Sequence, residues 1–312
     1  MFELLRAVFV APFADMAGNV TFLVEVLFGG VAAGLMYSLV ALGFVLIFKA
    51  SGVFNFAQGV MVLFSALTLV GLMERGVPVV VALALTALTM IALAYVIERV
   101  VLRPLVNQEP IILFMATIGL NFFLEGFGEM AWGANVKKLD IGIPDTSFIV
   151  RGVQINRLEL TAAVTAAVLV AILAVLFQRT KVGRALRAVA DDHEAALSIG
   201  IPLKTIWVVV WSVAGMVALV AGIMWGAKSG VQFSLSLIAL KSLPVLILGG
   251  FTSVPGAIVG GLIIGVGEKL GEVYWGPLVG GAIENWFAYV LALTFLLFRP
   301  QGLFGEKIIE RV

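Results

Sequence analysis

Long apolar stretches separated by short polar turns run through almost the whole chain. A helix of about 20 apolar residues spans the hydrocarbon core of a bilayer, and it satisfies its own backbone amides where no water is present. We therefore predict an all-α polytopic membrane protein that forms a single transmembrane domain over residues 1–312. Its eight or nine membrane elements fall near residues 20–48, 52–73, 77–98, 110–130, 159–178, 205–227, 234–250, 254–272 and 282–298.

Two interruptions of this pattern predict broken or re-entrant helices. Ser51 and Gly52 separate the first two segments, and three residues, 251–253, separate 234–250 from 254–272. Half-helices present free amides at their positive N-termini, and such ends suit a substrate carboxylate. The alternative is an ordinary turn with close glycine packing. Small-residue spacing that favours packing is found at Gly256, Gly260, Gly261 and Gly265.

Polar groups inside apolar segments are costly, so each is a candidate for a transport pathway. The ionisable ones are Glu25, Glu125, Lys241, Glu268, Glu272 and Glu284. Lys241 lies about two turns inside its segment, where it either lines the pathway or is a snorkelling or Glu-paired structural residue. The predicted pathway residues are Asn55, Gln58, Gly59, Lys241, Ser253 and Gly256.

Composition narrows the choice of function. The chain is 62% hydrophobic and 12% charged, whereas soluble domains carry about 25% charged residues. Its net charge of +1 gives no reason to expect nucleic-acid binding, and the absence of cysteine excludes disulfides and thiol catalysis. With one histidine, His193, a His-based metal site is not expected, and no phosphate-binding loop of the form G-x-x-x-x-G-K-[ST] occurs. We expect no enzyme activity and no cofactor in this chain.

Charged residues are concentrated in one segment, residues 179–204, which lies between two uncharged apolar segments. A helix over Lys181–Gly200 would place one apolar arc opposite a face of mixed charge. The arc is formed by Val182, Leu186, Val189, His193, Ala196 and Leu197. The helix either lies on membrane lipid or docks in the groove of a cytoplasmic partner, and its acidic residues favour the partner. The positive-inside rule places the segment in the cytoplasm, with the loop 131–158 and the N-terminus outside.

Five stretches in order give the sequence a family resemblance that runs from about residue 22 to residue 305. They are "GVFNFAQGVMVLFSA", "ERVVLRPLVNQEPIILFMATIGLNFFL", "GRALRAVADDHEAALSIGI", "LGGFTSVPGAIVGGLIIG" and "FRPQGLFG". The chain resembles permease subunits of bacterial ABC importers of the branched-chain amino acid type, and it is more similar to the shorter permease of the pair than to the longer one. The charged segment 179–204 corresponds to the family's cytoplasmic coupling segment.

This resemblance implies a multi-pass protein of the bacterial cytoplasmic (inner) membrane. Its expected partners are a second permease in a heterodimer, two cytoplasmic ATPases that bind the ATP, and a periplasmic or lipid-anchored substrate-binding protein. The residues expected to couple the chain to the ATPase are Gly183, Arg184, Arg187, Ala188, Asp191, Glu194, Ala195 and Gly200.

One residue departs from the family pattern, because Gln58 stands where the family usually has histidine. Glutamine keeps hydrogen bonding and loses titration, so a protonation role at this position is in doubt. Branched-chain amino acids, other amino acids, urea, amides and aromatic acids all remain open as substrates. The alternative class is an ion-coupled secondary transporter or channel, which has no need for the charged segment.

Overall fold

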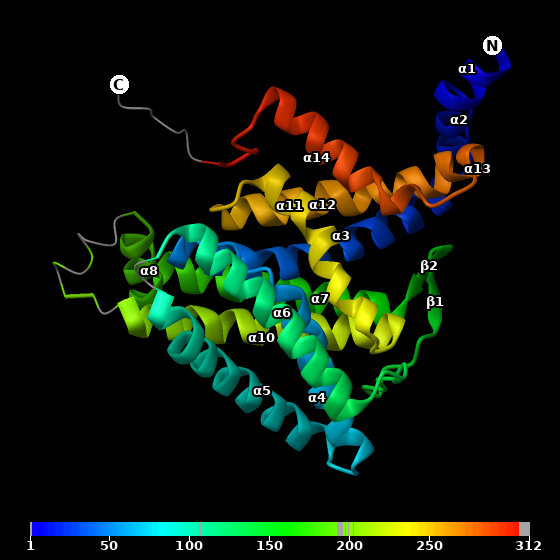
Figure 1. Cartoon of the computed structure of the whole chain (residues 1–312). Coiled ribbons are helices and arrows are strands. Elements are labelled where there is room, and N and C mark those ends of the chain that lie inside the picture. The colour runs from blue at the N-terminus through cyan, green and yellow to red at the C-terminus, as the bar shows by residue number, and fades with distance from the viewer. Residues whose placement is uncertain are drawn as a thin grey trace, which may run out of the picture.

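The computed structural model describes residues 2–105, 108–191, 196, 198, 200, 201 and 203–305 (Figure 1). Most of the described chain is helical. The exception to the predicted all-α class is a small antiparallel hairpin formed by β1 (Ser147–Val150) and β2 (Val153–Asn156). Its two-residue turn holds Arg151 and Gly152, both with positive φ, which is the geometry that tight hairpin turns require.

Nine helical segments carry the predicted apolar stretches, and the first stretch is one continuous helix. Six of them are long and apolar enough to cross a bilayer: α3 (Val20–Ser51), α5 (Val79–Val96) with its extension to Leu105, α6 (Pro110–Trp132), α7 (Arg157–Arg179), α10 (Leu203–Ser229) and α12 (Val254–Leu270) with its extension to Val279. Three are shorter: α4 (Gln58–Glu74), η3 (Phe233–Leu237) joined to α11 (Ile238–Gly249), and α14 (Phe287–Phe298). The number of complete crossings stays a prediction.

Short elements extend or connect these helices. The extension of α5 consists of a π-helical turn, η1 (Ile97–Leu102), and a 3₁₀ turn, η2 (Arg103–Leu105). After α12 come η4 (Gly271–Trp275), α13 (Gly276–Val279) and η5 (Ile283–Asn285).

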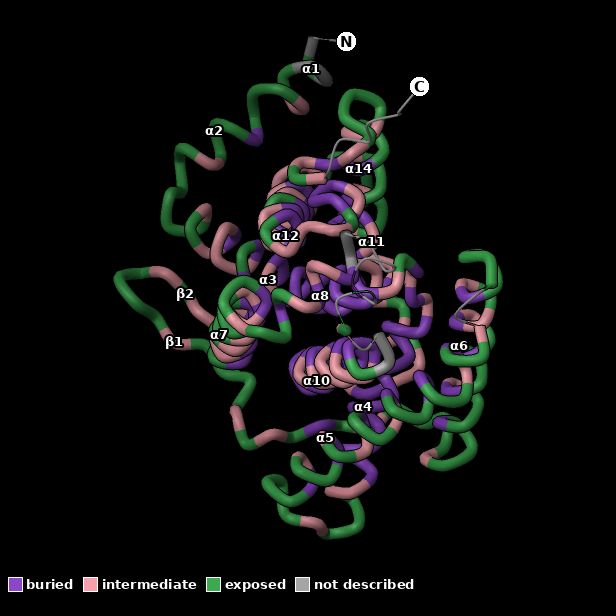
Figure 2. The backbone as a smooth tube through the Cα atoms, turned by 90° about the vertical axis from the view of Figure 1, so that its left-hand side faces the viewer, coloured by how far each residue is buried: buried purple, intermediate pink, exposed green. Residues whose placement is uncertain are grey.

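The core lies along α3, which packs against α12, α10, α7 and α11. Nearly every residue from Ala32 to Ile47 is buried, and α3 has no polar face that could contact solvent. Figure 2 shows burial concentrated on α3, α4 and α10, whereas α5, α6 and α14 keep exposed outer faces. A helix that is apolar on all sides is expected in such a central position.

Glycine brings α3 and α12 into backbone contact. A methyl group on Gly30 would lie 2.8 Å from the Cα atom of Val266, and one on Gly34 would lie 2.9 Å from that of Leu262. From the other side, Gly261 and Gly265 meet the backbone of α3. The packing interpretation of these two glycines is confirmed, because any side chain would force the helices apart.

The turn between α11 and α12 forms as its sequence predicts. Gly250, with φ of 100°, follows the last residue of α11, and the Ser253 hydroxyl accepts the Gly256 N–H at 3.0 Å to cap α12. The C-terminal turn covers this junction, since the Leu303 N–H donates to the Leu248 carbonyl at 2.8 Å. A carbonyl near the C-terminus of α11 is thus satisfied by a backbone N–H that lies 55 residues further along the sequence, at position 303 compared with 248.

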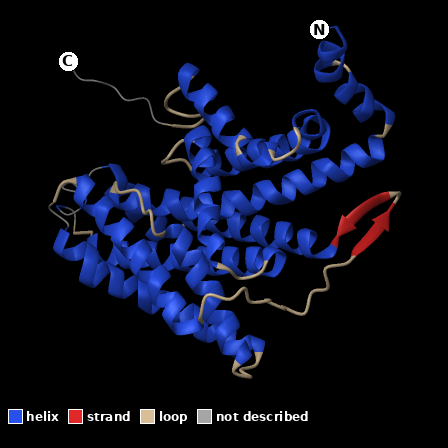
Figure 3. Ribbon diagram, turned by 45° about the vertical axis from the view of Figure 1, so that its right-hand side comes forward, coloured by secondary structure: helices blue, strands red, loops and turns tan. Residues whose placement is uncertain are grey.

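The two ends of the bundle differ. α8 (Lys181–Asp191) lies at one end, whereas α1 (Phe2–Phe9), α2 (Ala11–Gly18) and the hairpin lie at the other (Figures 1 and 3). The predicted arrangement, with the charged segment opposite the N-terminus and the 131–158 loop, agrees with this. The assignment of the α8 end to the cytoplasm stays a prediction.

Candidate translocation and coupling sites

The chain between α3 and α4 is non-helical over residues 52–57, and other parts of the protein satisfy its backbone. Gly52 ends α3 in the left-handed region, with φ of 68°. The Thr117 hydroxyl of α6 accepts the Phe56 N–H at 3.0 Å, and the Asn55 carboxamide oxygen accepts the Ala57 N–H at 3.1 Å. Irregular backbone is tolerated within a membrane only when it is buried and partnered in this way.

Contacts with two spanning helices place this break inside the bundle. Gln58 Nε2 lies 3.5 Å from the carbonyl of Ala214, eleven residues after the start of α10 at Leu203. At 1.5 Å per residue, that is about 16 Å along α10. Thr117 lies seven residues after the start of α6 at Pro110, or about 10 Å along it. The helix α4 therefore begins near the middle of its neighbours, as a half-helix does.

A second helix start meets α4 at the same depth. A methyl group on Gly59 would lie 2.6 Å from the Cβ atom of Ala239, and Gly59 also abuts the carbonyl of Ser236. Ser236 and Ala239 belong to the first turns of the η3–α11 segment, which is 17 residues long and therefore shorter than the six helices that are long enough to cross a bilayer. The positive ends of two half-helices thus converge at one level.

The predicted pathway residues at this break are enclosed within the chain. Asn55 and Gln58 are both 0% exposed. Their side chains are 3.5 Å apart, from Asn55 Nδ2 to Gln58 Oε1, and the Gln58 carboxamide packs on Gly43 of α3. They hold α3, α4 and α10 together in this state, and their role in a pathway stays a prediction.

A cavity of about 200 Å³ opens beside this break, between α6 and the η3–α11 segment. Its walls are mostly aromatic and aliphatic, and its polar side chains come from α6 and η3. The lining residues are Phe44, Phe54, Phe56, Asn121, Phe122, Glu125, Ser236, Leu237, Ala239, Leu240 and Leu243. Asn121 was not a sequence candidate; its place in an apolar run near Glu125 is the signal that could have found it.

The other predicted pathway residues lie elsewhere. Lys241 lies on α11, which packs against α12 with its buried Glu268. Within the described residues Lys241 forms no ion pair, so its role in a pathway and the alternative structural role both stay predictions. Ser253 caps α12 beside Gly256, and it lines a different cavity of about 200 Å³ with Lys49 and Arg187. The six candidates are therefore divided among three places.

The charged segment forms α8 from Lys181 to Asp191, but its apolar arc does not face outwards. Leu186, Val189 and Ala196 are at most 2% exposed and pack into the core formed by their own chain. For these three residues the expectation that they seat in a partner's groove is wrong, because α3, α7 and α10 pack against α8 on that side. Of the other members of the predicted arc, Val182 is 37% exposed, and His193 and Leu197 lie outside the described residues. The exposed surface of α8 includes Lys181, Val182 and Arg184, with Ala188 partly exposed.

Two contacts fix α8 to the last turns of α7. The Arg187 guanidinium donates to the Phe177 carbonyl, and Gly183 lies so close that a methyl group there would be 2.6 Å from the Leu176 oxygen. Cations favour helix C-termini because the last carbonyls carry partial negative charge. Gly200 is exposed, with φ of 84°, whereas the Asp191 side chain, Glu194 and Ala195 lie outside the described residues.

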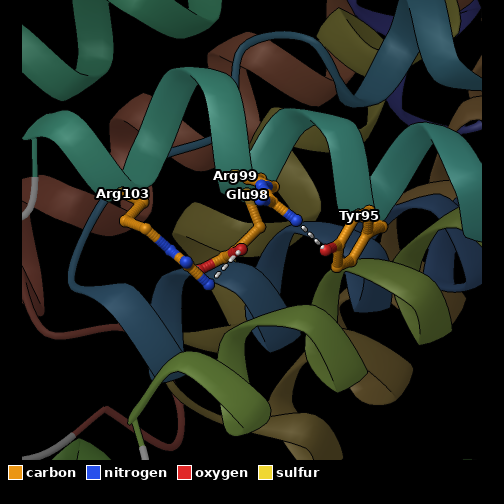
Figure 4. Close-up of polar contacts among 4 residues, drawn as sticks. All are labelled: Tyr95, Glu98, Arg99 and Arg103. Atoms are coloured by element: carbon orange, nitrogen blue, oxygen red, sulfur yellow. Dashed lines mark hydrogen bonds and ion pairs between the residues drawn. The ribbon is translucent and has the colours of Figure 1, made fainter.

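An ion pair with a buried carboxylate lies in the turns η1 and η2 that extend α5. Glu98 is 1% exposed, and its two carboxylate oxygens each lie 3.3 Å from a nitrogen of Arg103 (Figure 4). The neighbouring Arg99 donates to the Tyr95 hydroxyl at 2.6 Å. Glu98, Arg99 and Arg103 belong to the family stretch that begins ERVVLRPL, but no ion pair between Glu98 and Arg103 was predicted. Within the described residues, no group of three or more histidine, aspartate or glutamate side chains is placed to hold a metal ion.

Comparison with known proteins gives one family. The family model described as "Branched-chain amino acid transport system / permease component" matches residues 26–299. The permease protein BraD of a high-affinity branched-chain amino acid transport system in Pseudomonas aeruginosa is 29% identical, over 92% of this chain and 97% of BraD. The corresponding LivH protein of Salmonella typhimurium is 28% identical, over 95% of this chain and all of LivH. Among solved structures, PsaBC from Streptococcus pneumoniae in complex with Fab matches with a TM-score of 0.49 at 11% identity, over 92% of this chain and 94% of that chain, a likeness too distant to carry an argument.

Proposed function

Because the chain belongs to the family of permease components of branched-chain amino acid transport systems, we propose that it forms half of the transmembrane path of an ATP-driven importer of branched-chain amino acids. The observation that carries this proposal is the extent of the family match, which runs through the apolar helices from α3 to α14. The substrate is taken from the names of the relatives, and the apolar cavity beside α6 is compatible with it.

Energy for transport comes from separate ATPase subunits in this proposal. The sequence has no phosphate-binding loop, so the chain itself does not turn over ATP, and the ATP is bound by its partners. The α8 end of the bundle is the proposed docking side, since basic residues cluster there at the ends of α5 and α7 and on α8. Residues 179–204 are the proposed coupling segment.

The burial of the α8 apolar arc changes how such docking would work. An ATPase would meet the polar face of α8, where Arg184 is exposed, and its force would pass to α7 through Arg187 and Gly183. Opposite charges on such a face set the register of docking more than they add affinity. Asp191 and Glu194 remain proposed members of that face.

A second permease and a substrate-binding protein complete the assembly. Exposed apolar residues along α5, α6 and α14, such as Leu88, Phe122 and Leu293, supply surface for the second permease and for lipid. We propose a heterodimer in the bacterial inner membrane, with the binding protein at the hairpin end, and with that protein either free in the periplasm or lipid-anchored.

Reconstitution in liposomes tests the proposal. The chain is combined with the permease, ATPases and binding protein encoded beside it, and accumulation of radiolabelled leucine is measured. We expect accumulation only with ATP on the ATPase side, and none when the ATPase subunits are omitted. Accumulation driven by an ion gradient without those subunits would contradict the proposal and favour a secondary transporter. Saturable ATP turnover by the purified chain alone would also contradict it.

A further inference from the structure

The cavity beside the α3–α4 break has an unusual combination of walls. Phenylalanines at positions 44, 54, 56 and 122 line it, together with Leu240 and Leu243. The rings of Phe44 and Phe54 are stacked with their centroids 4.8 Å apart, which gives the cavity one firm aromatic side. Its volume of about 200 Å³ is below the roughly 300–1,000 Å³ of pockets for drug-sized ligands, so its occupant is smaller than those.

Two polar side chains of α6 face this apolar space from the same side of the helix. Asn121 and Glu125 are four residues apart, which places them one turn apart on one face. Asn121 is 9% exposed and Glu125 is half-buried. Within the described residues, neither side chain has a hydrogen bond or an ion pair, although both line the cavity.

An unpaired carboxylate within a spanning helix is expensive unless it faces a ligand or a wet path. Glu125 lies 15 residues into α6, about 22 Å from its start, whereas the half-buried Glu159 in the first turn of α7 has Lys228 at 2.7 Å. Among the described residues, no cationic side chain pairs with Glu125, so a bound cation would complete it. An ammonium group is the cation that suits one carboxylate beside one carboxamide oxygen.

The opposite wall offers the complementary charge. Ser236 and Leu237 belong to the beginning of the η3–α11 segment, which is 17 residues long and whose first turns abut Gly59 at the start of α4. The N-terminal end of a helix carries partial positive charge and free amides, and a half-helix start inside a membrane favours a carboxylate.

We propose that this cavity is a substrate subsite for a zwitterionic α-amino acid with an apolar side chain. Glu125 and Asn121 take the ammonium group, the start of η3–α11 takes the carboxylate, and the phenylalanines enclose the side chain. A charged or strongly polar side chain is disfavoured because it would lose its hydration without gaining a partner. The proposal rests on the proposed function for its substrate class, and it adds the site and the group that each part of the substrate meets.

Uptake by the complete reconstituted transporter provides the first test. Glu125→Gln keeps the shape of the side chain and removes its charge, and we expect leucine uptake at least ~10-fold below that of the unmodified complex. Glu129→Gln is the matched control, because Glu129 is exposed one turn further along α6 and does not line the cavity; its uptake is expected within about 2-fold of the unmodified complex. Glu125→Asp keeps the charge and is expected to retain more uptake than Glu125→Gln.

A single thiol gives a second readout that does not depend on transport rate. The chain has no natural cysteine, so when the complex is treated with a small alkylating reagent, the label found on this chain reports on Ser236→Cys alone. We expect leucine delivered by its binding protein to slow alkylation at least ~3-fold in the presence of ATP. Glu125→Gln added to Ser236→Cys should remove this protection, whereas Glu129→Gln should preserve it.

The outcomes separate this subsite from the proposed function. Normal uptake by Glu125→Gln, together with alkylation of the Ser236→Cys variant that is indifferent to leucine, would overturn the subsite while leaving the importer in place. Failure of the unmodified complex to accumulate leucine would overturn the importer itself. If Glu125→Gln fails to co-purify with the other subunits, a Ser236→Cys variant that leucine does not protect from alkylation would by itself overturn the subsite.

Discussion

Glu98 and Arg103 form a two-pronged ion pair across one π-helical turn, with both nitrogen–oxygen distances at 3.3 Å. The carboxylate is buried and the guanidinium is 39% exposed, so the arginine covers an acid that water does not reach. A normal α-helical turn would place these residues, five positions apart, on different faces. The π turn and the ion pair therefore belong together.

Removing Arg103 should cost stability because it leaves the Glu98 carboxylate buried and alone. We expect Arg103→Ala to lower the free energy of unfolding by about 1–3 kcal/mol, less than for a fully buried pair because Arg103 is partly exposed. Thermal unfolding of the purified chain in detergent measures this. Arg99→Ala is the control, since the polar contacts of Arg99 within the described part of the chain are with the exposed Tyr95, and its effect is expected below about 0.5 kcal/mol. Equal effects of the two variants would contradict the assignment.

The two arginines of α8 should separate docking from internal anchoring. Arg187→Ala removes the donor to the Phe177 carbonyl, so we expect a loss of about 1–2 kcal/mol in the stability of the isolated chain as well as lower transport. Arg184→Ala should leave the isolated chain unchanged, because Arg184 is exposed, and should weaken co-purification with the ATPase. Calorimetry of the chain and pull-down with the ATPase provide the two measurements. A stability loss in Arg184→Ala, or unchanged stability in Arg187→Ala, would reverse these roles.

The glycine contact between α3 and α12 should tolerate no side chain. Gly265→Ala would place a methyl group 2.5 Å from the Gly34 Cα atom, and we expect it to destabilise the chain by about 1–3 kcal/mol. Gly119→Ala on α6 is the control, since no atom lies within 4 Å of a methyl group there, and it should be neutral or slightly stabilising. Detergent unfolding midpoints of the two variants compare them directly.

The hydroxyl of Thr117 should hold the non-helical segment in place. Thr117→Val keeps the shape of the side chain but leaves the Phe56 N–H without its acceptor, at a cost of about 1–3 kcal/mol. Amide hydrogen exchange at Phe56 should become faster, while exchange in α10 stays slow. Thr89→Val is the control because its hydroxyl donates only to Leu85 of its own exposed helix. Unchanged exchange at Phe56 would show that the segment is held by other contacts.

Much of the helical layout could be predicted because apolar runs bounded by glycine and charge determine where helices begin and end. Ser51–Gly52 and the turn at 251–253 are examples, since each combines a helix terminator with a following start. The hairpin at 147–156 was missed, although Arg151–Gly152 between β-branched residues is a usable signal.

The sites were harder to predict, because periodicity gives the apolar face of a helix but not the neighbour that covers it. Leu186 and Val189 form the predicted arc of α8, yet that arc is buried against the chain itself. The cavity could not be predicted from the sequence either, because its lining residues Phe54, Asn121 and Ser236 come from three separate segments of the chain. Only the packing of α6 and α11 around the non-helical residues creates that neighbourhood.

The backbone contact between α3 and α12 has a mechanical consequence. Helices that contact each other through side chains can slide when those side chains change rotamer. Where glycines bring two backbones into direct contact, there is no side chain to adjust. The two helices should move as one rigid body, fixed relative to each other through the transport cycle. Opening and closing must then be carried by elements outside this pair, and α5 and α6, with their exposed outer faces, are the ones free to swing.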